Sequence, residues 1–244
     1  MGYECLSREV ILEASEQFNI PEIKLVRALH DSPSILDRFS SGKERYIAFF
    51  QAALLKHVQK DNVVYHGLAG HFFLQGIPHV LKVRIIADLE DRVKEEMKRE
   101  NISAEEARII LVKDDAERRK WSLHLYGVDA WDPRLYDIVI HIKNMTVDDA
   151  VSNILHTVQR PRFQTTPEGQ RILDDLTLSA QIEAALDKDF PKIKVNARNG
   201  EIFVNIRASL IDEKAITANV KHHAGKIAGV KTIQVNIVPF IIDE

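Results

Sequence analysis

The chain has 244 residues, of which 45% are hydrophobic, and its 33 basic and 36 acidic residues give a formal net charge of −3. This length and apolar content suffice for one medium-sized core and a small second domain, and they exclude disorder as the dominant state. The charge balance provides no overall field that attracts nucleic acid, so we expect no nucleic-acid partner; any such binding would have to be local.

Cys5 is the only cysteine, which excludes an intramolecular disulfide and favours a reducing compartment. No apolar run approaches the roughly 18 residues needed to span a bilayer, and the N-terminus has no signal-peptide pattern. We therefore expect a cytoplasmic protein without a transmembrane segment.

Short apolar runs alternate with helical patterns through residue 158. The first run, residues 3–6, leads directly into an amphipathic helix that Ser7 can cap. Further runs follow at 62–66, 79–87 and 136–142. Nearly continuous apolar strands separated by helices predict an α/β domain with a parallel sheet buried on both faces.

Two capping boxes mark the start of later helices in this first region. Ser103 with Glu106, and Thr146 with Asp149, have the spacing at which a hydroxyl and a carboxylate satisfy each other's backbone N–H groups. After them the composition changes to "QRPRFQTTP", which is typical of a linker. The sequence predicts a first domain over 1–160, a linker over 161–175 and a second domain over 176–244.

The second domain has a different apolar period. Two alternating strands surround Asn199-Gly200, a strong two-residue hairpin turn, and a helix with an apolar stripe follows and stops at Gly229. The predicted order is α-β-β-α-β, a half-buried sheet covered by two helices, with a helix at 177–187, strands at 193–197 and 202–208, a helix at 216–227 and a strand at 233–237.

Residues 2–158 resemble the cytidylate kinase-like branch of the nucleoside monophosphate kinases. The resemblance rests on "GYECLSREVILEA", "NVVYHGLAG", "HVLKVRIIADLEDRV", "VKDDAERRKW" and "WDPRLYDIVIHIKNMTVDDAVSNIL", in this order. It implies a P-loop fold, transfer of a phosphoryl group from ATP to a nucleoside monophosphate, and ATP and Mg as cofactors. In such kinases the first strand lies at the centre of the sheet and leads into the phosphate-binding loop, and the present opening lacks both.

A phosphate-binding loop needs G-x-x-x-x-G-K-[ST], because backbone N–H groups and a lysine surround the phosphates while a hydroxyl holds magnesium. The segment "SSGKE" at 40–44 supplies the glycine and the lysine of this pattern. The first glycine position, however, is Asp37, and the hydroxyl position is Glu44. We expect this chain to be inactive alone, and its status as an enzyme stays open. We also expect unpaired strand edges that rearrangement or another chain, as in a homo-oligomer, must close.

Candidate catalytic residues follow from the resemblance. Arg118 and Arg119, with Asp114 at the start of the segment, match the lid whose arginines close over phosphates in these kinases. The alternative is a solvated helix with Asp114 to Arg118 and Asp115 to Arg119 ion pairs.

Candidate substrate-binding residues also follow from the resemblance. Arg8 matches a basic residue beside the acceptor pocket, and Ser7 stands where relatives often have aspartate. Gly67 follows the strand as in the family, but Leu68 replaces the usual arginine, which removes a bidentate phosphate contact. Arg92 matches an arginine in a later helix, and a surface role is the alternative.

Residues 177–240 resemble a BON domain, through "NGEIFVNI" and "IAGVKTIQVNI". This resemblance implies a protein or phospholipid partner. The chain departs from it at 205–207, where many members have glycine. The ten histidines lack the spacing of a zinc site, so we expect no metal centre. Two functions stay open: a cytidylate kinase-like enzyme whose phosphate-binding loop comes from elsewhere, and a non-catalytic nucleotide-sensing or interaction module.

Overall fold

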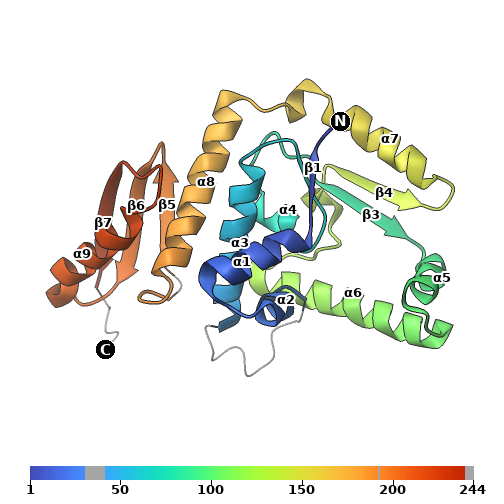
Figure 1. Cartoon of the computed structure of the whole chain (residues 1–244), viewed down its shortest axis with the longest axis horizontal. Coiled ribbons are helices and arrows are strands. Elements are labelled where there is room, and N and C mark those ends of the chain that lie inside the picture. The colour runs from blue at the N-terminus through green and yellow to red at the C-terminus, as the bar shows by residue number, and fades with distance from the viewer. Residues whose placement is uncertain (31–41, 192, 240–244) are drawn as a thin grey trace. The chain divides into compact units, whose positions relative to one another are not determined.

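The computed structural model describes residues 1–30, 42–191 and 193–239 (Figure 1). They belong to two compact units, which we describe separately. Of the described residues, the first unit comprises 1–28, 42–73, 167–191 and 193–239, and the second comprises 29–30 and 74–166.

The first unit begins with a parallel pair of strands, β1 (Glu4–Leu6) and β2 (Val63–Tyr65). Helix α1 packs on α3 because its buried Val10 and Ala14 are four residues apart and so share one face. Phe18 of α1 also stacks on Phe49 of α3, with 4.2 Å between ring centroids. The helices of this region are α1 (Arg8–Phe18), α2 (Glu22–His30), α3 (Gly42–Val58) and α4 (Gly70–Phe73).

Helix α8 (Pro167–Leu186) belongs to the same unit and contacts both α3 and β5. It begins at Pro167 rather than at residue 177, so part of the segment expected to be a linker is helical. Gln59 after α3 donates to Asp174, and Arg45 pairs with Asp187, each at 2.8 Å. Because α8 has buried residues along its whole length, it connects the α3 region firmly to the C-terminal strands.

The C-terminal strands form a three-stranded sheet in the order β5-β6-β7, and the predicted α-β-β-α-β order is confirmed. The β5–β6 hairpin turns at Asn199 and Gly200, both of which have positive φ, as a two-residue turn of this type requires. The helix ends at Ala224, before the expected stop at Gly229. The elements are β5 (Lys194–Arg198), β6 (Glu201–Arg207), the short helix η4 (Leu210–Asp212), α9 (Glu213–Ala224) and β7 (Thr232–Val238).

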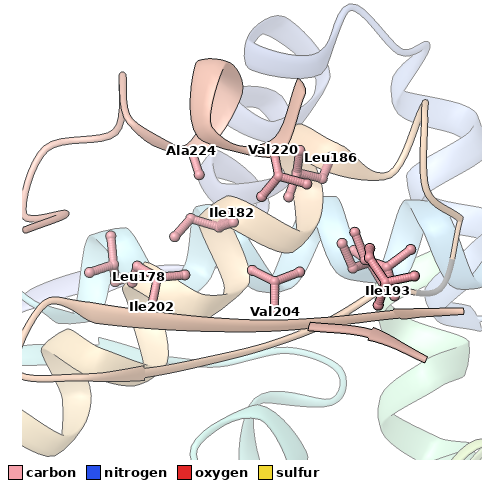
Figure 2. Packing of buried hydrophobic residues seen from close by; sticks show 10 residues of the cluster. Leu178, Ile182, Leu186, Ile193, Ile202, Val204, Val220 and Ala224 are labelled. Carbon is pink, nitrogen blue, oxygen red and sulfur yellow. The ribbon is translucent and has the colours of Figure 1, made fainter. Parts of the chain in front are cut away.

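The core of this module lies between its two helices and the sheet (Figure 2). Ile182 of α8, Ile202 of β6 and Val220 of α9 are all 0% exposed. Since alternate side chains of a strand point to opposite faces, both helices cover one face of the sheet and leave the other face open.

The second unit contains a second parallel pair, β3 and β4. Both capping boxes are confirmed: Ser103 and Glu106 start α6, and Thr146 and Asp149 start α7. The elements are β3 (Val83–Ala87), α5 (Leu89–Glu100), α6 (Ala104–Tyr126), η2 (Pro133–Leu135), β4 (Ile138–Ile142), α7 (Val147–Val158) and η3 (Pro161–Phe163).

The expected parallel sheet occurs as two separate two-stranded sheets, β1-β2 and β3-β4. The expectation that both faces are buried is wrong: Val64 is 50% exposed, Ile85 51% and Val139 39%. Among the described residues, each of these strands has a hydrogen-bonded neighbour on one side only. No described helix is long and apolar enough to cross a membrane.

Candidate functional site

Two predicted substrate-binding residues meet at the carboxyl ends of β1 and β2. The register aligns Leu6 with Tyr65, so Ser7 directly follows one strand as His66 and Gly67 follow the other. The backbone N–H of His66 donates to the Leu6 carbonyl at 3.0 Å and holds the two strand ends together. The carboxyl edge of parallel strands is where α/β proteins bind their ligands.

Ser7 occupies the N-cap position of α1, but its side chain makes no capping hydrogen bond. Its backbone N–H instead donates to Glu9 Oε2 at 2.8 Å. The prediction of a hydroxyl cap is therefore wrong: the carboxylate of Glu9 satisfies this end of the helix, and the resulting hydrogen bonds lower the pKa of Glu9. The Ser7 hydroxyl therefore does not hydrogen-bond to the first backbone N–H groups of α1.

Arg8 starts α1 and reaches Glu22 at the start of α2. Its Nε and Nη2 donate to the two carboxylate oxygens of Glu22 at 2.8 and 3.1 Å. The hydrogen bonds to Glu22 raise the pKa of Arg8. The Arg8 side chain is 70% exposed, so its guanidinium is accessible to a ligand that competes with Glu22.

The glycines of "GLAG" are required by the ring of Tyr65. A Cβ on Gly67 would lie 2.5 Å from the Tyr65 hydroxyl, and one on Gly70 would lie 2.6 Å from Tyr65 Cδ1. The Tyr65 hydroxyl donates to the Leu68 carbonyl at 2.9 Å, and burial raises the Tyr65 pKa. The segment is therefore a backbone turn wrapped around an aromatic ring, with Gly67 at the strand end.

In the second unit, Arg92 of α5 forms a bidentate pair with Asp115 of α6. Arg92 Nη1 and Nη2 donate to the two oxygens of Asp115 at 2.6 and 3.0 Å, and both side chains are largely shielded from solvent. The hydrogen bond to Asp115 raises the pKa of Arg92. Arg92 thus fixes α6 on α5 in this structure.

Arg119 is held by the loop that follows α6. Its Nε donates to Asp129 Oδ2 at 2.6 Å, and its guanidinium lies 5.1 Å from the centre of the Trp131 ring. Arg84 of β3 lies 6.0 Å from the same ring and donates to the Trp131 carbonyl. Trp131 therefore links α6 to β3 through two cation–π contacts.

The alternative of i,i+4 ion pairs on α6 is wrong, because Asp115 pairs with Arg92 and Arg119 pairs with Asp129. Within the part of the chain that the structure describes, the exposed side chain of Arg118 has no ion pair or hydrogen bond. Asp114 lies near enough to Arg92 to raise its pKa. The structure thus places Asp114, Arg118 and Arg119 on one helix but gives the two arginines different surroundings.

A polar cluster at the carboxyl ends of β3 and β4 was missed by sequence reasoning. Asp88 follows β3 and accepts from His141 Nε2 of β4 at 3.0 Å and from the Lys143 ammonium. Hydrogen bonding to Lys143 and His141 lowers the pKa of Asp88. A polar residue immediately after each apolar run was the available signal, since neighbouring parallel strands end at the same edge.

Among the described residues, no three His, Cys, Asp or Glu side chains converge as a metal site requires. The carboxylate of Asp88 at the strand edge already accepts hydrogen bonds from His141 and Lys143. Most of the segment around "SSGKE", from Asp37 to Ser41, lies outside the described residues.

Three curated relatives are similar to part of the chain. The cytidylate kinase of Sulfolobus acidocaldarius is 26% identical over 156 residues, which cover 64% of this chain and 80% of that protein. The cytidylate kinase of Thermococcus kodakarensis is 35% identical over 36% of this chain, and that of Methanosarcina acetivorans is 40% identical over 34%. The matches span 44% and 47% of these last two proteins, less than half of each.

A solved structure of an uncharacterized protein from Eubacterium ventriosum aligns with a TM-score of 0.43 and 22% identity, over 64% of this chain and 97% of that one. This likeness is too low to support an argument. The sequence model described as "Cytidylate kinase-like family", by contrast, matches residues 1–144, more than half of the chain. The chain belongs to the cytidylate kinase-like family.

Proposed function

We propose that the region up to about residue 160 is the acceptor-binding and lid part of a phosphotransferase that moves a phosphoryl group from ATP to a nucleoside monophosphate. The observation that carries this proposal is the carboxyl edge of β1 and β2, where Arg8 follows one strand and Gly67 the other. Family membership supplies the reaction class. A nucleotide is therefore the proposed small-molecule partner.

At this edge, Arg8 is the cation that reaches the acceptor phosphate. Glu22 holds it in a planar, bidentate geometry, which is also the geometry in which a guanidinium binds phosphate. A phosphate dianion brings more charge than Glu22 and can replace it. Leu68 cannot contribute a second cation, so Arg8 carries most of the phosphate recognition here.

In the lid, Arg118 is the better candidate for phosphate contact than Arg119. Arg118 is exposed and without a partner among the described residues, whereas Arg119 is bound to Asp129 and lies on Trp131. Phosphoryl transfer depends on positioned positive charge around the transferred group. Arg119 can join Arg118 only after it leaves Asp129. Arg92 of α5 supports the lid helix through its pair with Asp115, and Asp114 of the lid helix lies close to Arg92.

The phosphate-binding loop, in this proposal, comes from a segment outside these 244 residues. Two observations support it: the strands form two narrow parallel pairs, and these pairs expose Val64, Ile85 and Val139. Parallel sheets normally have both faces covered, so an additional strand with its loop and helix would give those side chains cover. ATP and magnesium, which the family uses generally, would take ligands from that segment.

Binding of CMP by the purified chain tests the acceptor site without requiring turnover. Isothermal titration calorimetry should detect CMP binding, and Arg8→Ala should weaken it at least about tenfold, because a charge-assisted hydrogen-bonded contact contributes roughly 1.5–3 kcal/mol. Arg171→Ala on α8 is the matched control, since Arg171 is an exposed arginine paired with Glu168. Equal effects of the two substitutions would contradict the proposal.

A second candidate function is a non-catalytic nucleotide-sensing or interaction module. Helix α8 favours it, because it contacts both α3 and β5 and so ties the C-terminal module to the helices beside the acceptor edge. The resemblance to a BON domain would then provide a protein or phospholipid partner. Nucleotide binding that changes pull-down of a protein or vesicle, with no turnover in any extended version of the chain, would select this function.

A further inference from the structure

The open face of the C-terminal sheet presents mainly polar and charged side chains. It is the face opposite the hydrophobic core, and we call it the open sheet face. Its cross-strand rows are fixed by the register: Lys194, Asn205 and Asn236 in one, Asn196, Phe203 and Gln234 in the next, Arg198, Glu201 and Thr232 in the third, and Arg207 with Val238 beyond the first.

Positive charge dominates this face. Lys194, Arg198 and Arg207 are exposed, and Glu201 is the only carboxylate in the rows. Within residues 1–30, 42–191 and 193–239, no ion pair or hydrogen bond involves the side chains of these three cations. By contrast, Arg45 on α3 holds a carboxylate. With three cations and one carboxylate, this face has an excess of positive charge and is complementary to an anion.

The centre of the open sheet face is aromatic and rich in amides. Phe203 is partly exposed in the middle strand, between Asn196 on one side and Gln234 on the other. Asn236 donates to Asn205 at 3.0 Å in the neighbouring row, and each of these amides keeps further donor and acceptor capacity. An aromatic ring flanked by amides can stack a base and bond its edges.

We infer that the open sheet face binds single-stranded nucleic acid, with Phe203 stacking on a base and Lys194, Arg198 and Arg207 contacting the phosphates. Lys194 and Arg198 stand at the two ends of β5, about 13 Å apart at the usual rise of a strand. Cations spaced along a strand match a chain of phosphates better than one compact anion. A lipid surface would call for several exposed aliphatic side chains, whereas the rows contain only the partly exposed Val238.

The near-neutral net charge of the whole chain gave no sign of this local cluster of cations. The three cations are separated in sequence by hydrophobic core residues of the opposite face, and only strand pairing gathers them. The inference is independent of the proposed kinase activity, because it uses residues of β5, β6 and β7 alone. Failure of one therefore does not affect the other.

Fluorescence anisotropy of a labelled 12-nucleotide oligouridylate with the full chain tests the inference. Three phosphate contacts predict that affinity falls about 20-fold between 50 and 200 mM salt. The triple variant Lys194→Gln, Arg198→Gln, Arg207→Gln should lose at least tenfold in affinity at 50 mM salt. Phe203→Leu, which keeps an apolar side chain of similar size, should lose about fivefold.

The control is the triple variant Lys214→Gln, Lys221→Gln, Lys226→Gln, which removes the same charge from α9 and the residues after it. It should bind as the unchanged chain does. Thermal melts identify any unfolded variant, and the exposed single variants Arg198→Gln and Arg207→Gln then replace the triple one. The inference is overturned by no anisotropy change at 50 mM salt, by equal losses in both triple variants, by an unaffected Phe203→Leu, or by equal affinity for inorganic polyphosphate. Binding to phosphatidylglycerol vesicles without binding to the oligonucleotide overturns it as well.

Discussion

The sheets of this molecule differ in how completely the chain covers them. In the C-terminal module, Ile202 and Val204 of the middle strand are 0% and 1% exposed beneath two helices (Figure 2). In the parallel pairs, Val64 is 50% exposed and Ile85 51%. The C-terminal sheet has a closed hydrophobic core. The parallel pairs have the strand direction of a kinase-like sheet, but their side chains are not covered on both faces. The difference shows that parallel strands in the expected order do not by themselves give a fully buried sheet.

The largest expected effect separates these two kinds of sheet directly. Ile202→Ala should destabilise the protein by about 2–5 kcal/mol, because it removes a fully buried side chain from a closed core. The matched change Ile85→Ala in β3 should cost below about 1 kcal/mol, since half of that side chain is already in water. Urea denaturation followed by circular dichroism measures both. Similar costs would show that the parallel pair is covered after all.

The next effect concerns the support of the lid helix. Arg92→Ala should destabilise the second unit by about 1 kcal/mol, because it leaves the partly buried Asp115 carboxylate without its bidentate partner. Arg108→Ala is the control: its pair with Glu90 also joins α5 and α6 but is more exposed, so the loss should stay below about 0.5 kcal/mol. Thermal melts compare them, and equal shifts would count against a supporting role of Arg92.

Some features of the fold could be predicted from the sequence and others could not. The hairpin at Asn199-Gly200 and the capping boxes at Ser103 and Thr146 were predictable because each depends on residues adjacent in sequence. The Arg92–Asp115 pair was not, because its members are 23 residues apart and meet only when α5 packs on α6.

The start of α8 shows a different limit. Two signals competed there: the prolines of "QRPRFQTTP" suggested a linker, while Pro167 occupies the first helical position, which proline favours. Burial of α8 against α3 and β5 decided in favour of the helix. Of the candidate site, the location of Ser7, Arg8 and Gly67 at a strand edge followed from the pattern. The partners of Arg8 and Arg119 did not, because they depend on tertiary packing.

A smaller effect would sharpen the contrast between the two lid arginines. Asp129→Asn should release Arg119 and tighten nucleotide binding up to about fivefold. The reason is that an exposed ion pair contributes about 0.2–1 kcal/mol, which Arg119 would no longer lose when it turns to the nucleotide. Asp132→Asn in the same loop, which removes the partner of Arg134, should leave affinity unchanged. Calorimetric titration with CMP or ATP measures both. Tighter binding in Asp132→Asn alone would refute the assignment of Asp129 as the group that holds Arg119.

The smallest effect tests the well-covered module itself. Burial raises the pKa of Glu183 on α8, whose carboxylate accepts the N–H of Val195 at 2.9 Å. The folded state therefore favours the protonated acid, and stability declines as the pH rises above the ordinary glutamate pKa of 4.5 through the raised value. Glu183→Gln should melt at a higher temperature than the unchanged chain at pH 7 and at a similar one at pH 4. A lower melting temperature at pH 7 would contradict this.

The central proposal, that the first 160 residues provide an acceptor edge and a lid while the donor-phosphate site comes from elsewhere, is tested most directly by phosphoryl transfer. Purified chain, CMP or dCMP, ATP and magnesium should yield no nucleoside diphosphate above the background without protein. Measurable turnover that Arg118→Ala abolishes would contradict the claim, since it would show that the chain positions both phosphates by itself.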